Sequence, residues 1–317
     1  MDTDTLSKGK ILVTGASGFV GRNLYETLKK IGYNVIGIQH SKNIPGLIKC
    51  DLTDYKQTTD ILKDIDYVFM VATKTYGAAT CTKNPCALVR EGIIMNVNLL
   101  DACYKKGVKK VLFISSSVVY QHSFKPLAEE DLDLNQVPFH LYMGVGWVKR
   151  YTEQLCKFYD QLGMDVNIVR PTNIYGKYDK LEEEKSHFVP AIIQRVIRRN
   201  SPFMVWGSGN NLKDLIYIDD FVRDILLVFK RHTGVDPINV CSGELHSIRD
   251  IVKDILDIGR HRVSPIYDTT KPDSVPYKCL IKNKFNSLFG KQDDVPLRKG
   301  LARTYNWYND FISSYKR

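Results

Sequence analysis

The chain has 317 residues, of which 44% are hydrophobic and 25% charged, ordinary fractions for a globular protein with a large core. No apolar run approaches the roughly 18 residues that a membrane-spanning helix needs, and the polar, acidic N-terminus does not resemble a signal peptide. These features exclude a membrane protein and predict a cytoplasmic one.

The net charge of +10 does not indicate nucleic-acid binding, because the Lys and Arg residues are spread along the chain with acidic residues between them. A solvated surface that attracts an anionic small substrate explains the excess better. The seven cysteines are scattered, with no CxxC pair and no histidine cluster at ligand spacing. We therefore expect free buried thiols and no metal site.

The first organised segment is a short apolar run, Ile11 to Val13, followed by a glycine turn and then by apolar residues at helical spacing. This order of strand, turn and helix is the context of a dinucleotide-binding loop. The first glycine permits the tight turn, the second lets the backbone approach a pyrophosphate, and the third lets helix and strand pack closely. The residues expected to hold the cofactor here are Gly15, Ser17, Gly18, Phe19, Val20 and Gly21.

The residues after the second predicted strand, 34–38, bear on the choice of cofactor. A carboxylate at this place would accept hydrogen bonds from the adenosine 2′-hydroxyl, but the chain has Gln39, His40, Ser41 and Lys42. The missing carboxylate favours NADP, whose 2′-phosphate could meet Lys42, His40 or Arg22, with NAD as the close alternative. Asp51 and Leu52, at the end of a third strand, are expected beside the adenine.

Strands and helices continue to alternate along the chain, which predicts a Rossmann-type doubly wound parallel sheet of the α/β class. The strands are expected at 66–72, 109–114 and 166–170, a ligand-binding loop at 73–85, and the helices at 91–106 and 147–162. Residues 171–176 break the strand and lead into a charged loop at 177–185, after which the pattern loosens into helices and short strands, as expected of a smaller C-terminal α/β substrate lobe. Residues 216–220 and 237–241 are expected to return to the first lobe. We expect a dinucleotide-binding domain at 1–172 with returns near 210–247, and a substrate lobe at 173–209 and 248–317.

Seven segments together resemble the extended short-chain dehydrogenases/reductases that act on nucleotide sugars, over roughly residues 9–310, and within them the GDP-fucose synthase group. The segments are the glycine motif Gly15 to Gly21, Ser115 to Tyr120, Arg170 to Gly176, Trp206 to Gly209, Tyr217 to Asp220, Asn239 to Gly243 and Lys271 to Asp273. Residues 186–191 and 300–308 are most similar to the GDP-fucose synthase group.

The resemblance implies a catalytic Ser or Thr at a strand end, with a Tyr and a Lys four residues apart on the following helix. Such a lysine lowers the pKa of the tyrosine and holds the nicotinamide ribose. Lys149 matches the lysine, because Glu153 follows it by four as in the family. Ser116 matches the serine that polarises the C4 oxygen, with Ser117 as the adjacent alternative.

The tyrosine position of this family is occupied by Val145, which has no proton to give. Tyr142 lies two helical turns before Lys149, about 10 Å along the axis of a regular helix. Only a helix start broken at Gly144 and Gly146 would bring it closer. Either Val145 is an inactivating engineered substitution, or the native chemistry manages without the tyrosine.

Other departures narrow the reaction that the resemblance implies. The family's 4,6-dehydratases carry an Asp-Glu pair where this chain has Val118 and Val119. The cysteine with which fucose synthases epimerise C3 and C5 is also absent, since its position is Val118, whereas the histidine partner remains as His187. Hydride transfer at C4 is the chemistry that survives, in a dehydrogenase, a reductase or a 4-epimerase of a GDP-linked hexose or heptose. A catalytically silent NAD(P)-binding sensor is the alternative.

The remaining site residues also follow from the resemblance, and several have a plain structural alternative. Lys213 lies where relatives have an arginine that grips the diphosphate, and a solvated lysine is the alternative; His187 is a surface or helix-cap residue if it does not contact substrate. Trp206 either stacks on the nucleoside or fills the lobe interface. Further cofactor contacts are expected at Ala72, Pro171 and Asn173, and substrate contacts at Asn173, His187, Val189, Trp206, Lys213 and Lys278.

Relatives of this kind form a homodimer, or a dimer of dimers, through a four-helix bundle. The two helices expected at 91–106 and 147–162 carry apolar residues beyond one face, namely Ile94, Met95, Phe158 and Tyr159. We therefore expect the same association here.

Overall fold

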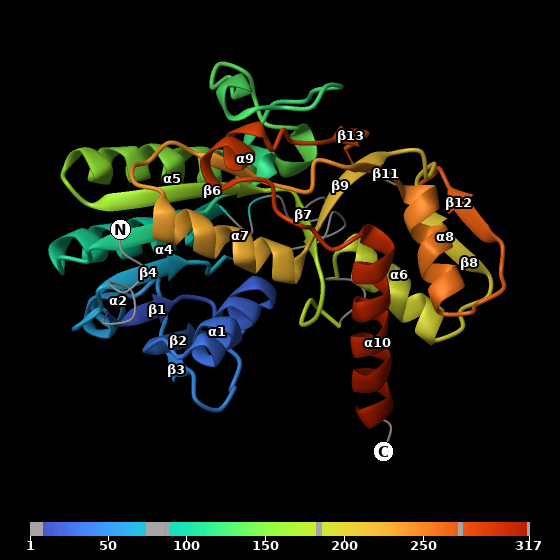
Figure 1. The fold of residues 1–317 in the computed structure, drawn as a ribbon, viewed down its shortest axis with the longest axis horizontal. Helices are drawn as coiled ribbons and strands as arrows, with labels where there is room; N and C mark the ends of the chain where they lie inside the picture. The colour runs from blue at the N-terminus through green and yellow to red at the C-terminus, as the bar shows by residue number, and fades with distance from the viewer. Residues whose placement is uncertain (1–8, 74–85, 87–88, 182–185, 272–274, 316–317) are drawn as a thin grey trace.

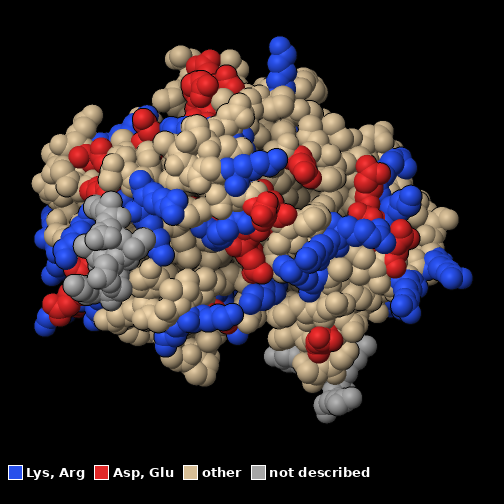
Figure 2. Space-filling view, viewed as in Figure 1, with Lys and Arg blue, Asp and Glu red and all other residues tan. Residues whose placement is uncertain are grey.

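The computed structural model describes residues 9–73, 86, 89–181, 186–271 and 275–315. A large sheet flanked by helices forms one side of the molecule, and a second region of short strands and helices forms the other (Figure 1). Lys and Arg side chains are dispersed over the face shown in Figure 2, with Asp and Glu among them. Among the described residues, no helix has both the length and the apolarity to cross a membrane.

The large sheet has seven parallel strands in the order β10-β6-β5-β4-β1-β2-β3, which confirms the doubly wound arrangement. The central strands β1, β4 and β5 are buried throughout, which explains their continuous apolar runs. The strand order reverses between β1 and β4, and ligands bind such sheets at this switch point, beyond the carboxyl ends of the strands. The strands are β1 Ile11–Val13, β2 Val35–Gln39, β3 Ile48–Lys49, β4 Tyr67–Met70, β5 Lys110–Ile114, β6 Asp165–Pro171 and β10 Ile238–Val240.

Two groups of helices cover the two faces of this sheet. Helices α1 (Phe19–Ile31) and α7 (Ile218–Arg231) pack against each other on one face. Helices α2 (Tyr55–Ile61), α4 (Val89–Lys105) and α5 (Met143–Gln161) cover the other.

Helix α5 begins at Met143, so the expected start at Trp147 was four residues late. Gly144 and Gly146 lie inside the helix and do not break it, which removes the arrangement that would have carried Tyr142 toward Lys149. A Cβ at Gly146 would lie 2.8 Å from the carbonyl oxygen of Val118. The glycine therefore serves close packing and not a bend.

The second region contains a small mixed sheet in the order β11-β9-β13, with β7 also paired to β9, and a two-stranded sheet of β8 and β12. Strand β9 belongs to this small sheet, so the predicted return at residues 216–220 is made by the start of α7, whereas β10 does join the large sheet. The exact lobe boundaries stay a prediction. The elements are β7 Asn173–Tyr175, α6 Phe188–Ile197, β8 Phe203–Trp206, β9 Leu212–Tyr217, β11 Leu245–Ser247, α8 Ile248–Ile258, β12 Pro265–Asp268, β13 Tyr277–Lys278, α9 Asn283–Phe289 and α10 Leu297–Tyr315, with short 3₁₀ turns at Ser117–Val119, Glu129–Asp131 and His140–Tyr142.

Some sequence-based expectations fall partly on residues outside the described ranges. These are the loop 73–85, of which only Thr73 is described, the segment 271–273, of which only Lys271 is described, and Cys81. The other six cysteines are free thiols; five are buried, but Cys86 is exposed, against the expectation of burial throughout.

Candidate functional site

The glycine loop lies at the carboxyl end of β1 and leads into α1. Gly15 has a φ of +65°, and a Cβ there would lie 2.9 Å from the Cα of Ala72 on the neighbouring chain segment. A Cβ at Gly21 would lie 2.2 Å from the carbonyl oxygen of Gly15, so only glycine permits this contact. Gly18 is the N-cap of α1 and provides no side-chain cap, and the first turn, from Phe19 and Val20, carries no acidic residue. This bare, positive helix end fits the pyrophosphate of a dinucleotide.

The residues after the end of β2 include two basic side chains, of which Lys42 contacts the glycine loop. The Nζ of Lys42 donates a hydrogen bond of 3.0 Å to the carbonyl oxygen of Ser17. The exposed His40 lies 3.7 Å from Asp51, whose pKa is lowered chiefly by hydrogen bonds from Thr53. Arg22 is held elsewhere, because it pairs with a glutamate on α1 and lies over the ring of a tyrosine.

Strand β3 ends at Lys49, and Asp51 and Leu52 follow it after one intervening residue. Leu52 is buried. The placement of both residues after the third strand agrees with the sequence-based expectation.

Lys149 lies deep beneath the carboxyl end of β5. Its Nζ donates a hydrogen bond of 2.7 Å to the carbonyl oxygen of Ile114 and lies 4.6 Å from the centroid of the Phe113 ring. Burial lowers the pKa of this ammonium to about 8, against the opposing attraction of Glu153. With its pKa lowered to this value, Lys149 is charged at neutral pH but loses its proton in mildly basic solution.

Glu153 belongs to a buried polar network that the sequence had not revealed. Its carboxylate accepts a hydrogen bond of 2.5 Å from Ser115 and forms an ion pair of 2.7 Å with Arg170. Arg170 in turn donates to the hydroxyl of Tyr120, which donates to Asn239. Burial would lower the pKa of Arg170, but Glu153 outweighs it and the pKa is raised. The network fixes α5, β5, β6 and β10 to one another below Lys149.

Of the two candidate serines, Ser116 is the more open to a ligand. Ser116 is half-buried, and its Oγ accepts a hydrogen bond of 3.3 Å from the backbone of Val118, as expected of a strand-end cap. Ser117 is buried, and its Oγ has no partner within the described residues. Ser116 can therefore keep its cap and still donate its hydroxyl hydrogen to a substrate oxygen.

Val145 is half-buried in the first turns of α5, one turn before Lys149. Tyr142 is the N-cap residue of the same helix, and the Nζ of Lys278 lies 5.8 Å from the centroid of its ring. Tyr142 therefore lies close to Lys278, a predicted substrate-binding residue, although the two are more than 130 positions apart in the sequence.

His187 stands at the N-cap of α6, but its side chain makes no capping hydrogen bond. Its Nδ1 lies 2.8 Å from a carboxylate oxygen of Asp179, which is buried, whereas 42% of the imidazole side chain is exposed. Sequence reasoning missed Asp179. The two residues are eight positions apart in the sequence, and no periodic pattern signals such a contact.

The small sheet places three basic residues side by side. Lys213 on β9 is in register with Lys278 on β13 and with His246 on β11, so their side chains leave the same face. The Nζ of Lys213 donates to the carbonyl oxygen of Val275, and burial lowers the pKa of Lys278 to about 8, with Asp214 opposing the shift. A diphosphate would compensate this charge. Sequence reasoning missed His246, because the register of short strands is not evident locally.

The other predicted residues lie in different surroundings. Pro171 ends β6, and Asn173 begins β7, where its amide donates to the backbone of Asp214. Trp206 ends β8 in the two-stranded sheet and is 46% exposed. Val189 is buried in the main core, and its predicted substrate contact stays a prediction.

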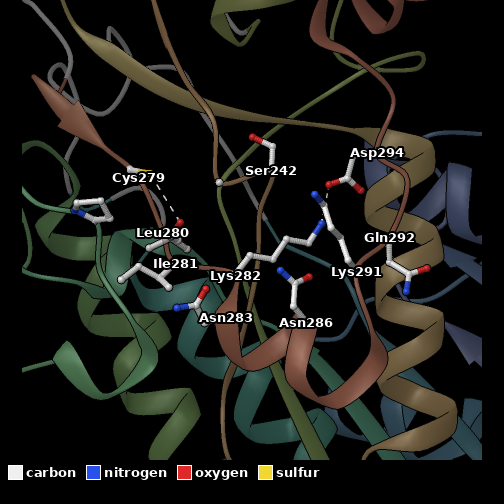
Figure 3. Close-up of a pocket in the computed structure, with 12 residues that line it drawn as sticks. Ser242, Cys279, Leu280, Ile281, Lys282, Asn283, Asn286, Lys291, Gln292 and Asp294 are labelled. Carbon is white, nitrogen blue, oxygen red and sulfur yellow. Dashed lines mark hydrogen bonds and ion pairs between the residues drawn. The ribbon is translucent and has the colours of Figure 1, made fainter.

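A separate pocket of about 340 Å³ lies between the end of β13 and α9, and none of the predicted site residues lines it (Figure 3). Across it, the Nζ of Lys282 donates a hydrogen bond of 2.7 Å to Asp294 and lies 3.4 Å from Asp224. The lysine charge is therefore already compensated. This pocket lacks the convergent groups of the site at the sheet switch point.

A doubly wound sheet with a glycine loop at its switch point and a buried lysine on the helix after β5 defines a dinucleotide-binding short-chain dehydrogenase/reductase. A sequence model of the NAD dependent epimerase/dehydratase family matches residues 11–241. The chain belongs to this family, and its extended short-chain dehydrogenase/reductase form is similar to that of GDP-fucose synthase.

Individual relatives match the chain over nearly its whole length. It is 28% identical to a probable GDP-L-fucose synthase of Oryza sativa, over 98% of this chain and 94% of that protein. It is also 28% identical to GDP-L-colitose synthase of Yersinia pseudotuberculosis, over 94% of this chain and 97% of that protein. The crystal structure of UDP-glucose 4-epimerase from Thermotoga maritima superimposes with a TM-score of 0.86 at 25% identity, covering 96% of this chain and 99% of that one.

Proposed function

We propose that this protein is an NAD(P)-dependent oxidoreductase that transfers a hydride at C4 of a GDP-linked hexose or heptose, as a dehydrogenase, a reductase or a 4-epimerase. The observation that carries the proposal is the position of Lys149, which is buried and donates a hydrogen bond to Ile114 at the carboxyl end of β5, two residues before Ser116. The two GDP-sugar synthases to which the chain is similar support the class of substrate.

Each part of the site has a role in this proposal. The bound nicotinamide supplies or accepts the hydride. Lys149 holds the nicotinamide ribose, and Ser116 donates a hydrogen bond to the C4 oxygen. Lys213 and Lys278 bind the diphosphate, which fixes the sugar relative to Ser116.

The test is a single-turnover measurement of nicotinamide absorbance, with a GDP-sugar supplied as the 4-hydroxy and as the 4-keto compound. An absorbance change at 340 nm with either sugar supports the proposal. Tight binding of the nucleotide sugar in calorimetry without turnover would contradict it. Mass spectrometry of the ligand that copurifies with the protein would identify the cofactor and its oxidation state.

We propose NADP as the cofactor, on the strength of Lys42 and His40 at the end of β2. Lys42→Ala should then weaken NADP binding by about tenfold or more and leave NAD binding nearly unchanged, because only NADP has the 2′-phosphate. Lys30→Ala, which removes an exposed lysine from the far end of α1, is the control for net charge. Equal losses of affinity for NADP and NAD would indicate that Lys42 does not act through the 2′-phosphate, and would favour NAD as the cofactor.

The second candidate function is a catalytically silent NAD(P)-binding sensor, which Val145 favours. Such a protein would retain the glycine loop, but it would not need the basic row of Lys213, Lys278 and His246. Cofactor binding without calorimetric binding of any GDP-sugar would support this alternative.

A further inference from the structure

His187 is oriented by a buried carboxylate and not by the helix that it precedes. Its Nδ1 lies 3.0 and 2.8 Å from the two carboxylate oxygens of Asp179. The side chain of Asp179 is 1% exposed, and that of His187 is 42% exposed. The Nε2 edge of the ring is the edge away from the carboxylate.

The carboxylate has little freedom to move. It accepts a hydrogen bond of 2.8 Å from the backbone N–H of Lys180, and its own backbone carbonyl accepts one of 2.9 Å from the hydroxyl of Tyr308 on α10. Two residues earlier, the carbonyl oxygen of Lys177 accepts a hydrogen bond of 3.0 Å from Asn23. Asn23 lies on α1, the helix whose N-terminus meets the proposed pyrophosphate.

The same loop has a second anchor on α1. The guanidinium of Arg22 lies 3.9 Å from the centroid of the Tyr178 ring. Tyr178 in turn packs edge-on against Trp307 of α10. The loop that carries Asp179 is thus held between the cofactor-binding helix and the C-terminal helix.

We propose that Asp179 is a positioning residue of the site, which holds His187 with its proton on Nδ1 and its bare Nε2 presented to a hydroxyl of the bound sugar. The inference rests on the proposed function for the identity of the ligand. Its chemistry is general, because the hydrogen bond made by one ring nitrogen determines which tautomer is present. A buried carboxylate accepts the Nδ1 hydrogen and cannot donate one while ionised.

The direct test is ¹⁵N NMR of histidine-labelled protein without ligand, at a pH where the ring is neutral. The His187 signals are assigned by their loss in His187→Gln. We expect the wild-type ring to carry its proton on Nδ1, and Asp179→Asn to lose this preference, because an amide can either donate or accept. A wild-type ring protonated on Nε2, or an unchanged tautomer in Asp179→Asn, would overturn the proposal.

Tyr308→Phe is the matched control, because it removes an anchor of the loop without touching the carboxylate. This variant should unfold at a lower temperature but retain the Nδ1 tautomer. If it loses the tautomer as completely as Asp179→Asn does, the general rigidity of the loop and not the carboxylate orients the ring.

Kinetics provide an independent readout. Asp179→Asn should lower kcat by at least about tenfold with little change in KM, since the residue acts on orientation and not on affinity. The double variant with His187→Gln should be no slower than His187→Gln alone; fully additive losses would contradict a shared role. If wild-type protein transfers no hydride with any GDP-sugar, the proposed function fails, whereas the NMR result still decides the role of Asp179.

Discussion

Val145 is the residue that we expect to limit the chemistry of the proposed site most. It lies one helical turn before Lys149, where the resemblance to the family implies a tyrosine, and the regular start of α5 leaves Tyr142 a further turn away. Lys149 is held by its hydrogen bond to Ile114, and the hydroxyl of Ser116 can still donate a hydrogen bond. In the proposed function, the group still to be supplied is a proton carrier.

Val145→Tyr should therefore raise the rate of C4 hydride transfer by at least about 10²-fold, the lower end of what a positioned acid or base contributes. Single-turnover nicotinamide absorbance measures the effect, and Val145→Phe is the control for ring size without the hydroxyl. A folded, cofactor-binding Val145→Tyr protein that is no faster would indicate that position 145 does not face the substrate or that the native chemistry uses another group, with His187 and Tyr142 next to be tested.

We expect Lys149 to make cofactor affinity depend on pH. Burial lowers its pKa to about 8, so the ammonium that would hold the nicotinamide ribose is lost as the pH rises through this value. Cofactor affinity, measured by calorimetry, should fall between pH 7 and 9.5. Lys149→Arg should remove this fall because arginine keeps its charge, and Lys149→Met should bind weakly throughout.

The free energy of unfolding should change in the opposite direction to cofactor affinity over part of this pH range. The folded pKa of about 8 lies below the ordinary value of 10.5, so between these values the unfolded chain binds more protons at Lys149 than the folded chain does. The contribution of this residue to the free energy of unfolding therefore rises with pH across that window. A loss of affinity accompanied by a parallel loss of stability would point to unfolding and not to Lys149.

At the scale of elements, the sequence predicted well wherever the information was local. The run Ile11 to Val13, its glycine turn and the amphipathic α1 are all contained in about twenty residues. The small sheet is different, because its strands have two to six residues and pair through a register that no local pattern specifies. The contacts of His246 with its neighbours on β9, and of Asp179 with His187, depend on that tertiary arrangement.

Within the glycine loop, the three glycines have separable roles. Gly18 has an ordinary φ of −86°, and a Cβ there would lie 3.2 Å from the carbonyl oxygen of Gly15. Gly18→Val should therefore fold but bind no dinucleotide, because its branches fill the space beside the backbone that the pyrophosphate needs. Calorimetry with NADP and NAD measures the loss.

Gly21→Ala is the informative comparison, because its Cβ would lie 2.2 Å from the same carbonyl oxygen and nothing flexible can yield. Unlike Gly18→Val, this variant should be less stable than the wild-type protein, which a lower melting temperature would show. Unchanged cofactor content in a folded Gly18→Val protein would refute the placement of the pyrophosphate.

At the scale of the whole molecule, the helices α4 and α5 pack against each other, and several apolar side chains on them or directly after them are exposed. Of the apolar residues predicted to lie beyond one face of these helices, Phe158 is 52% exposed, whereas Met95 and Tyr159 are partly buried against the core. We call the exposed residues Tyr104, Trp147, Tyr151, Phe158 and Leu162 the apolar stripe.

We propose that this stripe is the homodimer interface, in which α4 and α5 meet their copies as a four-helix bundle. Apolar residues at positions 147, 151, 158 and 162 recur along one side of α5, and such a patch on a soluble protein marks an interaction surface. A two-fold axis through it would pair the patch with itself. Tyr151→Glu combined with Phe158→Glu should place four like charges in that interface and yield a monomer in sedimentation velocity at micromolar concentration. Leu288→Glu, at an exposed apolar residue on α9, should remain dimeric; a wild-type monomer, or a dimer that tolerates both glutamates, would rule out this interface.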